Sequence, residues 1–255
     1  MVKGMYSAAA GVFVQQKSMD SIANNISNTS TAGYKSQATL ESSFGEHLTS
    51  RLSDLPRVSS KNIGPGSFIT INSSQYTDFA QGHMEATERN VDMAIQGEGF
   101  FLVESDTFGT VLTRNGQFEI DGEGNLYLPG VGRVLDEGKG RISIENSGFT
   151  VDNDGVIRSG NNETAVLYIA KVDENTNLRM VGDGIFQVKE TDGFKQAEKG
   201  TYRIMQGYIE RSNVNMAKEL TRMIACQNQY NSCTQIIKMY DKLNELTVNQ
   251  IGRIG

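Results

Sequence analysis

The chain has no uninterrupted apolar run of the roughly 18 residues that a membrane-spanning helix needs. Its best candidate lies near the N-terminus and is broken by Gln15, Gln16 and Lys17. This stretch also differs from a cleaved signal peptide, because no small-residue cleavage site follows the mildly apolar residues 5–14. The sequence therefore predicts no membrane-spanning helix, and it predicts that any export from the cytoplasm uses a route that leaves the N-terminus in place.

Cysteine and histidine are scarce, with two of each among 255 residues. Cys226 and Cys233 lie seven positions apart on a predicted helix, which separates their Cα atoms by about 10 Å. A disulfide needs Cα atoms within roughly 7 Å, so we expect both to be small apolar residues in a helix seam. His47 and His83 share no zinc-ligand spacing with a cysteine or with each other. We therefore expect no metal site.

Clustered positive charge is also missing. The chain has a net charge of −6, of which residues 1–34 carry +1 and residues 207–255 carry +2, so the middle carries −9. A surface that binds nucleic-acid phosphates needs clustered Lys and Arg. The acidic middle therefore excludes nucleic acid as a partner.

No catalytic motif is complete. Gly97-Glu98-Gly99 has two glycines of a nucleotide-binding loop but neither the third glycine nor a following helix, so it predicts a hairpin. Residues 150–155 are similar to half of a calcium loop, but Thr150 stands at the first ligand position and Asn161 at the twelfth, where a bidentate Glu belongs. Most carboxylates stand beside glycine in predicted turns and not in an acid–base pair. The sequence predicts no enzyme, no cofactor and no small-molecule substrate.

Amphipathic helical stretches stand at both ends of the chain. In the first, over about residues 5–28, apolar residues recur every three or four positions, which is the spacing of one helix face. The second runs over about residues 215–250, after candidate N-cap residues in 212–215. We expect the two stripes to pack as a coiled coil and to form the assembly surface. The stripes consist of Met5, Ala8, Val12, Met19, Ile22, Ala23 and Ile26, and of Met216, Leu220, Met223, Tyr230, Cys233, Ile237, Tyr240 and Leu243.

The sequence between the helices is typical of an antiparallel β domain. Alternating apolar residues in 68–72, 93–95 and 100–103 predict strands, and closely spaced Gly, Asn and Asp residues predict the turns between them. The predicted fold is α+β, with terminal helices around a mainly antiparallel β middle. Its segments are the N-terminal helix (1–34), a connecting segment (35–65), the β-rich domain (66–205), and a hinge with the C-terminal helix (206–255).

Several motifs are spread over nearly the whole chain. They are MYSAAAG at 5–11, DSIANNISN at 20–28, TAGYK at 31–35, DFAQG at 78–82, DMAIQGEGFF at 92–101, TRNGQF at 113–118 and QGYIERSNVN at 206–215. Together they closely resemble the motifs of the bacterial flagellar rod and hook protein family. The motif positions are Asn24, Asn25, Asn28, Gly33, Tyr34, Gly82, Asp92, Gly97, Gly99, Phe100, Phe101, Arg114, Gly116, Phe118, Ser212, Asn213 and Val214. The chain departs from the family at Glu88, because the family usually places a glycine after the preceding threonine.

The resemblance implies a structural subunit of the flagellar basal-body rod. Such a subunit is exported by the flagellar type III apparatus without a cleaved signal peptide. It polymerises through its terminal helices into the drive-shaft that transmits torque to the hook. The implied partners are copies of the chain and other rod and hook subunits, and the implied location is the rod, outside the cytoplasmic membrane.

Within the family, the length excludes the much longer hook protein, and the β domain disfavours the small, mostly helical rod subunits. The short link from Lys35 to Gly82 and the residues 76–79 favour the proximal-rod type over the distal-rod type. Two other functions compete with the rod subunit. The chain could be a cap or adaptor that uses its terminal helices only to dock on the rod, or a wall hydrolase that opens peptidoglycan for the rod.

Overall fold

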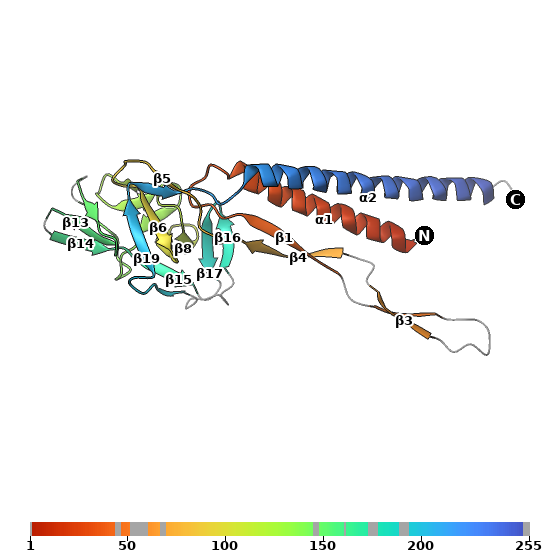
Figure 1. The fold of residues 1–255 in the computed structure, drawn as a ribbon, viewed down its shortest axis with the longest axis horizontal. Coiled ribbons are helices and arrows are strands. Elements are labelled where there is room, and N and C mark those ends of the chain that lie inside the picture. Colours follow the sequence, from red (N-terminus) through yellow and green to blue (C-terminus); the bar gives the residue numbers. More distant parts are fainter. Residues whose placement is uncertain are drawn as a thin grey trace. The chain divides into compact units, whose positions relative to one another are not determined.

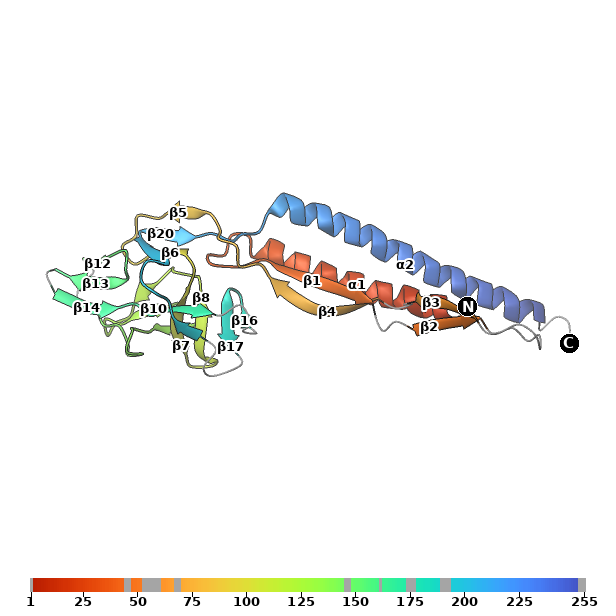
Figure 2. The ribbon, with the colours of Figure 1, turned by 60° about the horizontal axis from the view of Figure 1, so that its bottom comes forward.

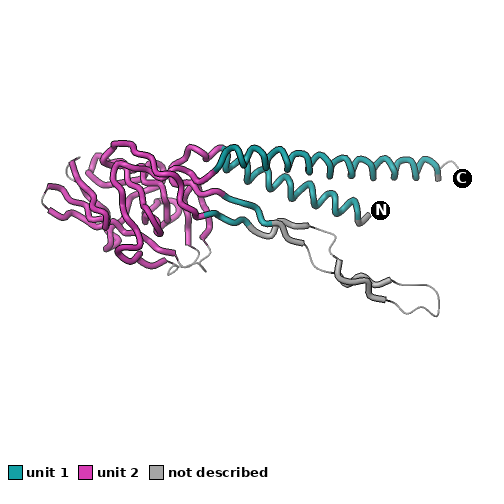
Figure 3. The backbone as a smooth tube through the Cα atoms, in the orientation of Figure 1, with its two compact units in different colours: residues 1–26, 37–78, 215–255 teal, residues 27–36, 79–214 magenta. Residues whose placement is uncertain are grey.

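The α+β class predicted from the sequence is confirmed by a computed structural model. It describes residues 2–43, 47–51, 61–66, 70–144, 148–160, 162–172, 178–188 and 194–251. A helix stands at each end of the chain (Figures 1 and 2), and the strands, which pair antiparallel, come between the two helices in the sequence. The chain divides into two compact units (Figure 3). Unit 1 comprises residues 1–26, 37–78 and 215–255, and unit 2 comprises residues 27–36 and 79–214.

Unit 1 contains both helices, α1 (Val2–Ser27) and α2 (Met216–Ile251), which run side by side in opposite directions (Figures 1 and 2). A Cβ added to Gly4 would lie 2.3 Å from Tyr240 Oη, and one added to Gly11 would lie 3.0 Å from Cys233 Sγ. Glycine inside a helix costs about 0.5–1 kcal/mol relative to alanine. At these two positions it leaves room for side chains of α2. The pairing as a coiled coil stays a prediction.

Helix α2 begins where the sequence predicts it, directly after the candidate N-cap residues. The Asn215 side chain accepts a hydrogen bond from the backbone N–H of Lys218 at 3.1 Å, as an N-cap residue does. One of the four candidate residues in 212–215 is thus identified as the cap.

Unit 1 also contains two antiparallel strand pairs. Strand β1 (Gln37–Ser43) pairs with β4 (Thr70–Thr77), and β2 (His47–Arg51) pairs with β3 (Lys61–Gly66). Residues 37–78 therefore cluster with the helices, whereas the sequence boundaries place a connecting segment over 35–65 and begin the β domain at 66. Strand β1, with the sequence QATLESS, has only Ala38 and Leu40 as apolar residues, an alternation too short to mark a strand.

Unit 2 contains the remaining strands. These are β5 (Met84–Ala86), β6 (Met93–Gly97), β7 (Phe100–Ser105), β8 (Gly109–Thr113), β9 (Glu119–Ile120), β10 (Leu126–Leu128), β11 (Gly132–Val134), β12 (Thr150–Val151), β13 (Val156–Ser159), β14 (Asn162–Val166), β15 (Ile169–Val172), β16 (Leu178–Gly182), β17 (Ile185–Val188), β18 (Phe194–Gln196), β19 (Tyr202–Gln206) and β20 (Tyr208–Glu210). The largest sheet of the described residues has the order β16-β17-β8-β7-β11-β10-β9, with β15 joining β7 to β18. Smaller sheets are β12-β13-β14, β19-β6 and β20-β5.

Both faces of strand β7 are buried, which shows that it lies at the centre of unit 2. Successive side chains of a strand point to opposite faces. Phe101 and Val103 accordingly pack in one apolar cluster with Phe118, and Phe100 and Leu102 pack in another. Each fully buried apolar side chain contributes about 1.5–3 kcal/mol, so these clusters supply the stability that positions the rest of the unit.

The glycine-rich turns are partly as predicted. Gly124, Gly155 and Gly160 have φ values of +84°, +85° and +64° and lie between paired strands. The hairpin predicted at Gly97-Glu98-Gly99 is wrong, because β6 pairs with β19, and β7 pairs with β8, β11 and β15. The segment is a corner between two sheets.

Glu88, where the chain departs from the family motif, has a φ of +59°. A non-glycine residue is strained in this region, by about 1–2 kcal/mol. We expect Glu88→Gly to raise the free energy of unfolding by up to about 1 kcal/mol, after the extra unfolded-state entropy of glycine is subtracted. Urea unfolding checks this, with Glu163→Gly in strand β14 as the control that should destabilise. A Glu88→Gly variant no more stable than Glu163→Gly would contradict the strain.

Candidate functional site

The predicted helix stripes are partly buried in the single chain. On α2, half-buried side chains recur at intervals of three and four, at Met223, Cys226, Tyr230, Cys233, Ile237 and Tyr240. Three members of the predicted stripe, Met216, Leu220 and Leu243, are 46–50% exposed. On α1, Ala8 and Ile22 are buried, Val12, Met19 and Ile26 are half-buried, and Met5 and Ala23 are exposed. Val14, which is 4% exposed, was not among the predicted positions.

A second apolar stripe on α2 was missed by the sequence reasoning. Ile236, Met239, Leu243 and Leu246 recur at intervals of three, four and three, and they are 43–64% exposed. On α1, Tyr6 and Phe13 stand seven positions apart and are 65% and 68% exposed. Contiguous exposed apolar surface of this kind marks interaction sites in soluble proteins. Each helix thus exposes large apolar side chains in addition to its half-buried ones.

The motif residue Asn25 fastens the last turn of α1 to strand β1 within unit 1. Its Oδ1 accepts a hydrogen bond from the Gln37 N–H at 2.9 Å, and its Nδ2 donates to the Gln37 carbonyl at 2.7 Å. Ser21 Oγ donates to the same carbonyl at 3.2 Å. An amide side chain offers a donor group and an acceptor group side by side, as the backbone of a neighbouring strand does. This explains why the motif needs asparagine at a position that is 1% exposed.

The segments of unit 2 that lead to the two helices meet at a buried ion network. Glu210 Oε1 accepts hydrogen bonds from Lys35 Nζ at 2.6 Å and from the Gly82 N–H at 2.8 Å. Glu210 Oε2 accepts one from Arg114 Nη1 at 3.2 Å. The three charged side chains are at most 6% exposed. We call this network, with residues 27–36, 79–82, 113–116 and 208–214, the junction.

Arg114 connects the junction to strand β6. Its Nη2 donates to the Gly97 carbonyl at 2.8 Å and its Nη1 to the Ile95 carbonyl at 3.3 Å. The guanidinium also lies 5.2 Å from the centre of the Phe100 ring. Burial lowers the pKa of Arg114, and the Glu210 carboxylate acts in the opposite direction. Removing that carboxylate would leave a buried cation with only neutral partners in the described part of the chain, apart from exposed Glu98.

Three motif glycines permit close backbone contacts in the junction. Gly33, with a φ of +69°, donates its N–H to the Glu210 carbonyl at 2.8 Å. A Cβ on Gly33 would lie 2.2 Å from the backbone N of Asn115. A Cβ on Gly82 would lie 1.9 Å from the Arg211 carbonyl oxygen, and one on Gly116 would lie 1.6 Å from that of Met93. No side chain fits at these distances without a backbone shift.

Further motif residues complete the junction. Asn213 Oδ1 accepts a hydrogen bond from the Ser36 N–H at 2.8 Å, and its Nδ2 donates to the Ala80 carbonyl at 3.1 Å. Asn28 Nδ2 donates to Asp183 Oδ1 at 3.2 Å. Tyr34 is fully buried, and Ser212 Oγ accepts from the Val214 N–H.

The other motif residues lie outside the junction. Phe101 and Phe118 pack edge to face in the core, 5.0 Å apart. Asp92 is 1% exposed, and its carbonyl accepts from the Gly207 N–H at 2.8 Å. Gly97 and Gly99 form the corner, and Asn24 is exposed on α1.

Lys35 and Glu210 lie within two of the sequence motifs, but no role for either was predicted from the sequence. A signal was present, because Glu210 is a lone acid directly after the apolar Tyr208-Ile209 pair of a short strand. Among the residues that the structure describes, no three His, Cys, Asp or Glu side chains could hold a metal ion together. In the same residues, no helix is long and apolar enough to cross a membrane.

Comparison with known proteins agrees with the motifs. Residues 205–251 match the family model of the flagellar basal body rod FlgEFG protein C-terminal region, and residues 94–159 match that of the flagellar hook protein FlgE/F/G D1 domain. The flagellar basal-body rod protein FlgF of Caulobacter vibrioides is 29% identical, over 100% of this chain and 99% of its own length. Over nearly its whole length, the chain is therefore similar to flagellar basal-body rod proteins.

Two relatives from Bacillus subtilis also match nearly the whole chain. The flagellar basal-body rod protein FlgG is 28% identical over 98% of the chain and 99% of its own length. The flagellar hook-basal body complex protein FlhO is 23% identical over the full length of both. These names describe basal-body and rod proteins and no catalytic activity. The two matched models include Arg114 of the junction, and also Glu210 and the whole of α2.

Proposed function

We propose that this chain polymerises through α1 and α2 as a structural subunit of the flagellar rod, the drive-shaft that transmits torque to the hook. The second apolar stripe of α2 carries the proposal, because its four side chains are exposed in the single chain, whereas most of the first stripe of α2 is half-buried. Burying its four side chains against neighbouring subunits would contribute at most about 6–12 kcal/mol, at 1.5–3 kcal/mol each. Such a contribution exists only in the assembly.

The junction suits a subunit that transmits force. Both segments of unit 2 that lead to the helices are held by one carboxylate, Glu210, and by the close contacts of Gly33 and Gly82. Pulling on either segment therefore loads the same buried network. A network fixed in this way keeps the relative positions of the two segments under load.

The finer assignment follows the sequence motifs. The proposed partners are copies of the chain and other rod and hook subunits, and the proposed export route is the flagellar type III apparatus. We propose the proximal-rod type, with the distal-rod type and a rod-docking adaptor as alternatives. Imaging the rod stub in a strain without the protein separates the types, because loss of a distal subunit leaves a longer stub.

A carboxylate in the exposed stripe is expected to stop assembly without unfolding the chain. Met239→Asp places a charge where the proposal requires an apolar contact, and burying an unpaired charge is strongly unfavourable. We expect loss of swimming and loss of the chain from purified basal bodies, with an unchanged urea midpoint. Asn231→Asp, which adds the same charge at another exposed position of α2, should leave both intact. Normal swimming of the Met239→Asp strain would refute assembly through this stripe.

A further inference from the structure

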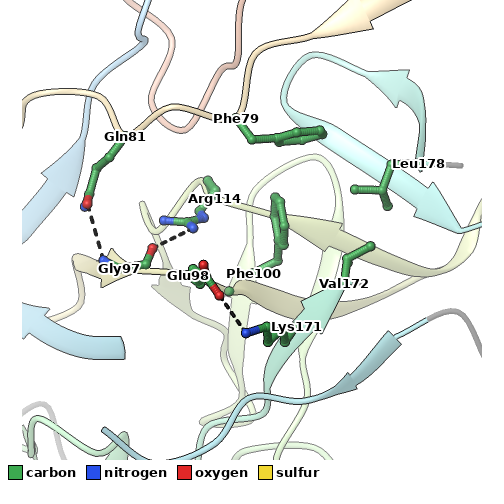
Figure 4. A pocket seen from close by; sticks show the side chains of 10 residues that line it. Phe79, Gln81, Gly97, Glu98, Phe100, Arg114, Lys171, Val172 and Leu178 are labelled. Carbon is green, nitrogen blue, oxygen red and sulfur yellow. Dashed lines mark hydrogen bonds and ion pairs between the residues drawn. The ribbon is translucent and has the colours of Figure 1, made fainter. Parts of the chain in front are cut away.

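A cavity of about 720 Å³ opens on the surface of unit 2 (Figure 4). One wall is apolar: Phe79 packs edge to face against Phe100 and Phe186, with ring centres 5.7 and 5.4 Å apart, and Val172 and Leu178 continue the wall. Phe79 is nevertheless 40% exposed, so its ring is available to a further contact. We call this the Phe79 cavity.

The rest of the cavity is polar and has a net positive charge. Its charged lining residues are Arg114, Lys171 and Glu98, which sum to +1. Lys171 Nζ and Glu98 Oε2 form an ion pair at 2.7 Å at the exposed rim. Arg114 lies deeper, is 6% exposed, and its Nε has no hydrogen-bond partner in the described part of the chain. An apolar group that carries a negative charge beside it would complement this lining.

A group of this kind lies elsewhere on the same unit. In the turn Ser105–Gly109, which we call the Phe108 turn, Phe108 is 43% exposed and Asp106 is exposed beside it. The Phe108 carbonyl accepts a hydrogen bond from Gln187 Nε2 at 3.0 Å, which fixes the turn on strand β17. Among the described residues of unit 2, Phe79 and Phe108 are the exposed large apolar side chains.

The Phe108 turn and the Phe79 cavity lie at opposite ends of one hairpin. Strands β7 and β8 pair from Phe101 and Thr113 at the cavity end to Ser105 and Gly109 at the turn. At about 3.4 Å per residue, the five steps from Phe100 to Ser105 separate the two ends by about 17 Å. Because a central, doubly buried strand joins them, their separation is fixed.

We propose that the Phe108 turn of one copy inserts into the Phe79 cavity of the next copy, with Asp106 facing Arg114 and Lys171. The contact joins two different surfaces, and contacts of this type repeat into rings or open helical arrays and do not stop at a dimer. The inference rests on the proposed function, since it needs copies stacked in a rod. It adds a second link, between β units, to the contacts of the helices.

Photo-cross-linking in assembled basal bodies tests the contact. Phe108 is replaced with the photoreactive aromatic residue p-benzoyl-phenylalanine, basal bodies are isolated and irradiated, and the cross-linked peptides are identified by mass spectrometry. We expect cross-links from position 108 to the peptides that contain Phe79 or Leu178 of a second copy. The same residue at Thr107, which is also exposed in the turn, should give a much lower yield.

A second variant covers the case in which the bulky residue prevents assembly. Phe108→Cys combined with Leu178→Cys should give a ladder of disulfide-linked multimers in oxidised basal bodies. Each single variant shows the background from Cys226 and Cys233, and neither should give a ladder. Exclusion of both position-108 variants from basal bodies, with the Thr107 variant incorporated, would also support a contact made by Phe108.

Three results would overturn the inference. They are incorporation without cross-links, cross-links from 108 to a different protein, and cross-links from 108 to 108, which would indicate a symmetric dimer. In each case the chain is present in the basal body, so the proposed function stands. Absence of the unaltered chain from basal bodies would instead refute the proposed function.

Discussion

Glu210→Gln is expected to lower the free energy of unfolding of unit 2 by about 3–5 kcal/mol, because it leaves two buried cations without their carboxylate. Glutamine keeps the shape and one acceptor, but it adds a donor beside the donors of Lys35 or Arg114. Urea unfolding followed by circular dichroism measures the loss, since the chain has no tryptophan for fluorescence.

The matched control is Glu85→Gln. Glu85 pairs with Arg211 through two hydrogen bonds but lies at the surface, where solvent screens the pair. We expect almost no change in stability there.

Lys35→Met gives a further check, because it leaves the Arg114–Glu210 pair in place and should therefore cost less than Glu210→Gln. Equal losses in the free energy of unfolding for Glu210→Gln and Glu85→Gln would show that the buried network stabilises the chain no more than the surface pair does.

Gly33→Ala is expected to be about as damaging, with a loss of about 2–6 kcal/mol. Two separate effects add up here: a left-handed backbone conformation costs a side chain about 1–3 kcal/mol, and overpacking against the Asn115 backbone costs about 1–3 kcal/mol. Because Gly33 lies in the segment that leads to α1, we also expect the variant to be missing from basal bodies.

Two other glycines separate the effects. Gly160 has a φ of +64° and nothing within 4 Å of an added Cβ, so Gly160→Ala should show the conformational cost alone, about 1–2 kcal/mol. Gly122 has neither a positive φ nor a close neighbour, so Gly122→Ala should be nearly neutral. If Gly33→Ala unfolds at the same urea concentration as Gly160→Ala, the close contact with Asn115 is not a constraint.

The sequence was informative wherever a local pattern determines the structure. The apolar run at 100–103 became the doubly buried β7, and the Asn215 cap and the bounds of both helices follow from local hydrogen bonding and helix spacing. Polar strand β1 was missed because its partner β4 is about 30 residues away and its two apolar residues, Ala38 and Leu40, are too few to mark a strand. The hairpin at Gly97 failed for a related reason, since glycine permits a turn but does not determine which strands pair.

The junction could not be predicted because its members come from four distant segments. Lys35, Gly82, Arg114 and Glu210 are separated by up to 175 residues and meet only through tertiary packing. The motif resemblance marked Gly82 and Arg114, yet it did not indicate that one carboxylate joins them. On α2, the predicted stripe follows the side that includes Tyr230 and Cys233 and does not include Ile236, Met239 and Leu246.

Hydrogen exchange of the α1 and α2 backbone amides, compared between the free chain and purified basal bodies, tests the central claim most directly. If the helices are the assembly site, their outer apolar faces lack partners in the free chain, and their amides should exchange quickly there and become strongly protected in the basal body. Unit 2 should be protected in both states. Terminal helices that are already fully protected in the free chain, with no gain on assembly, would contradict the account.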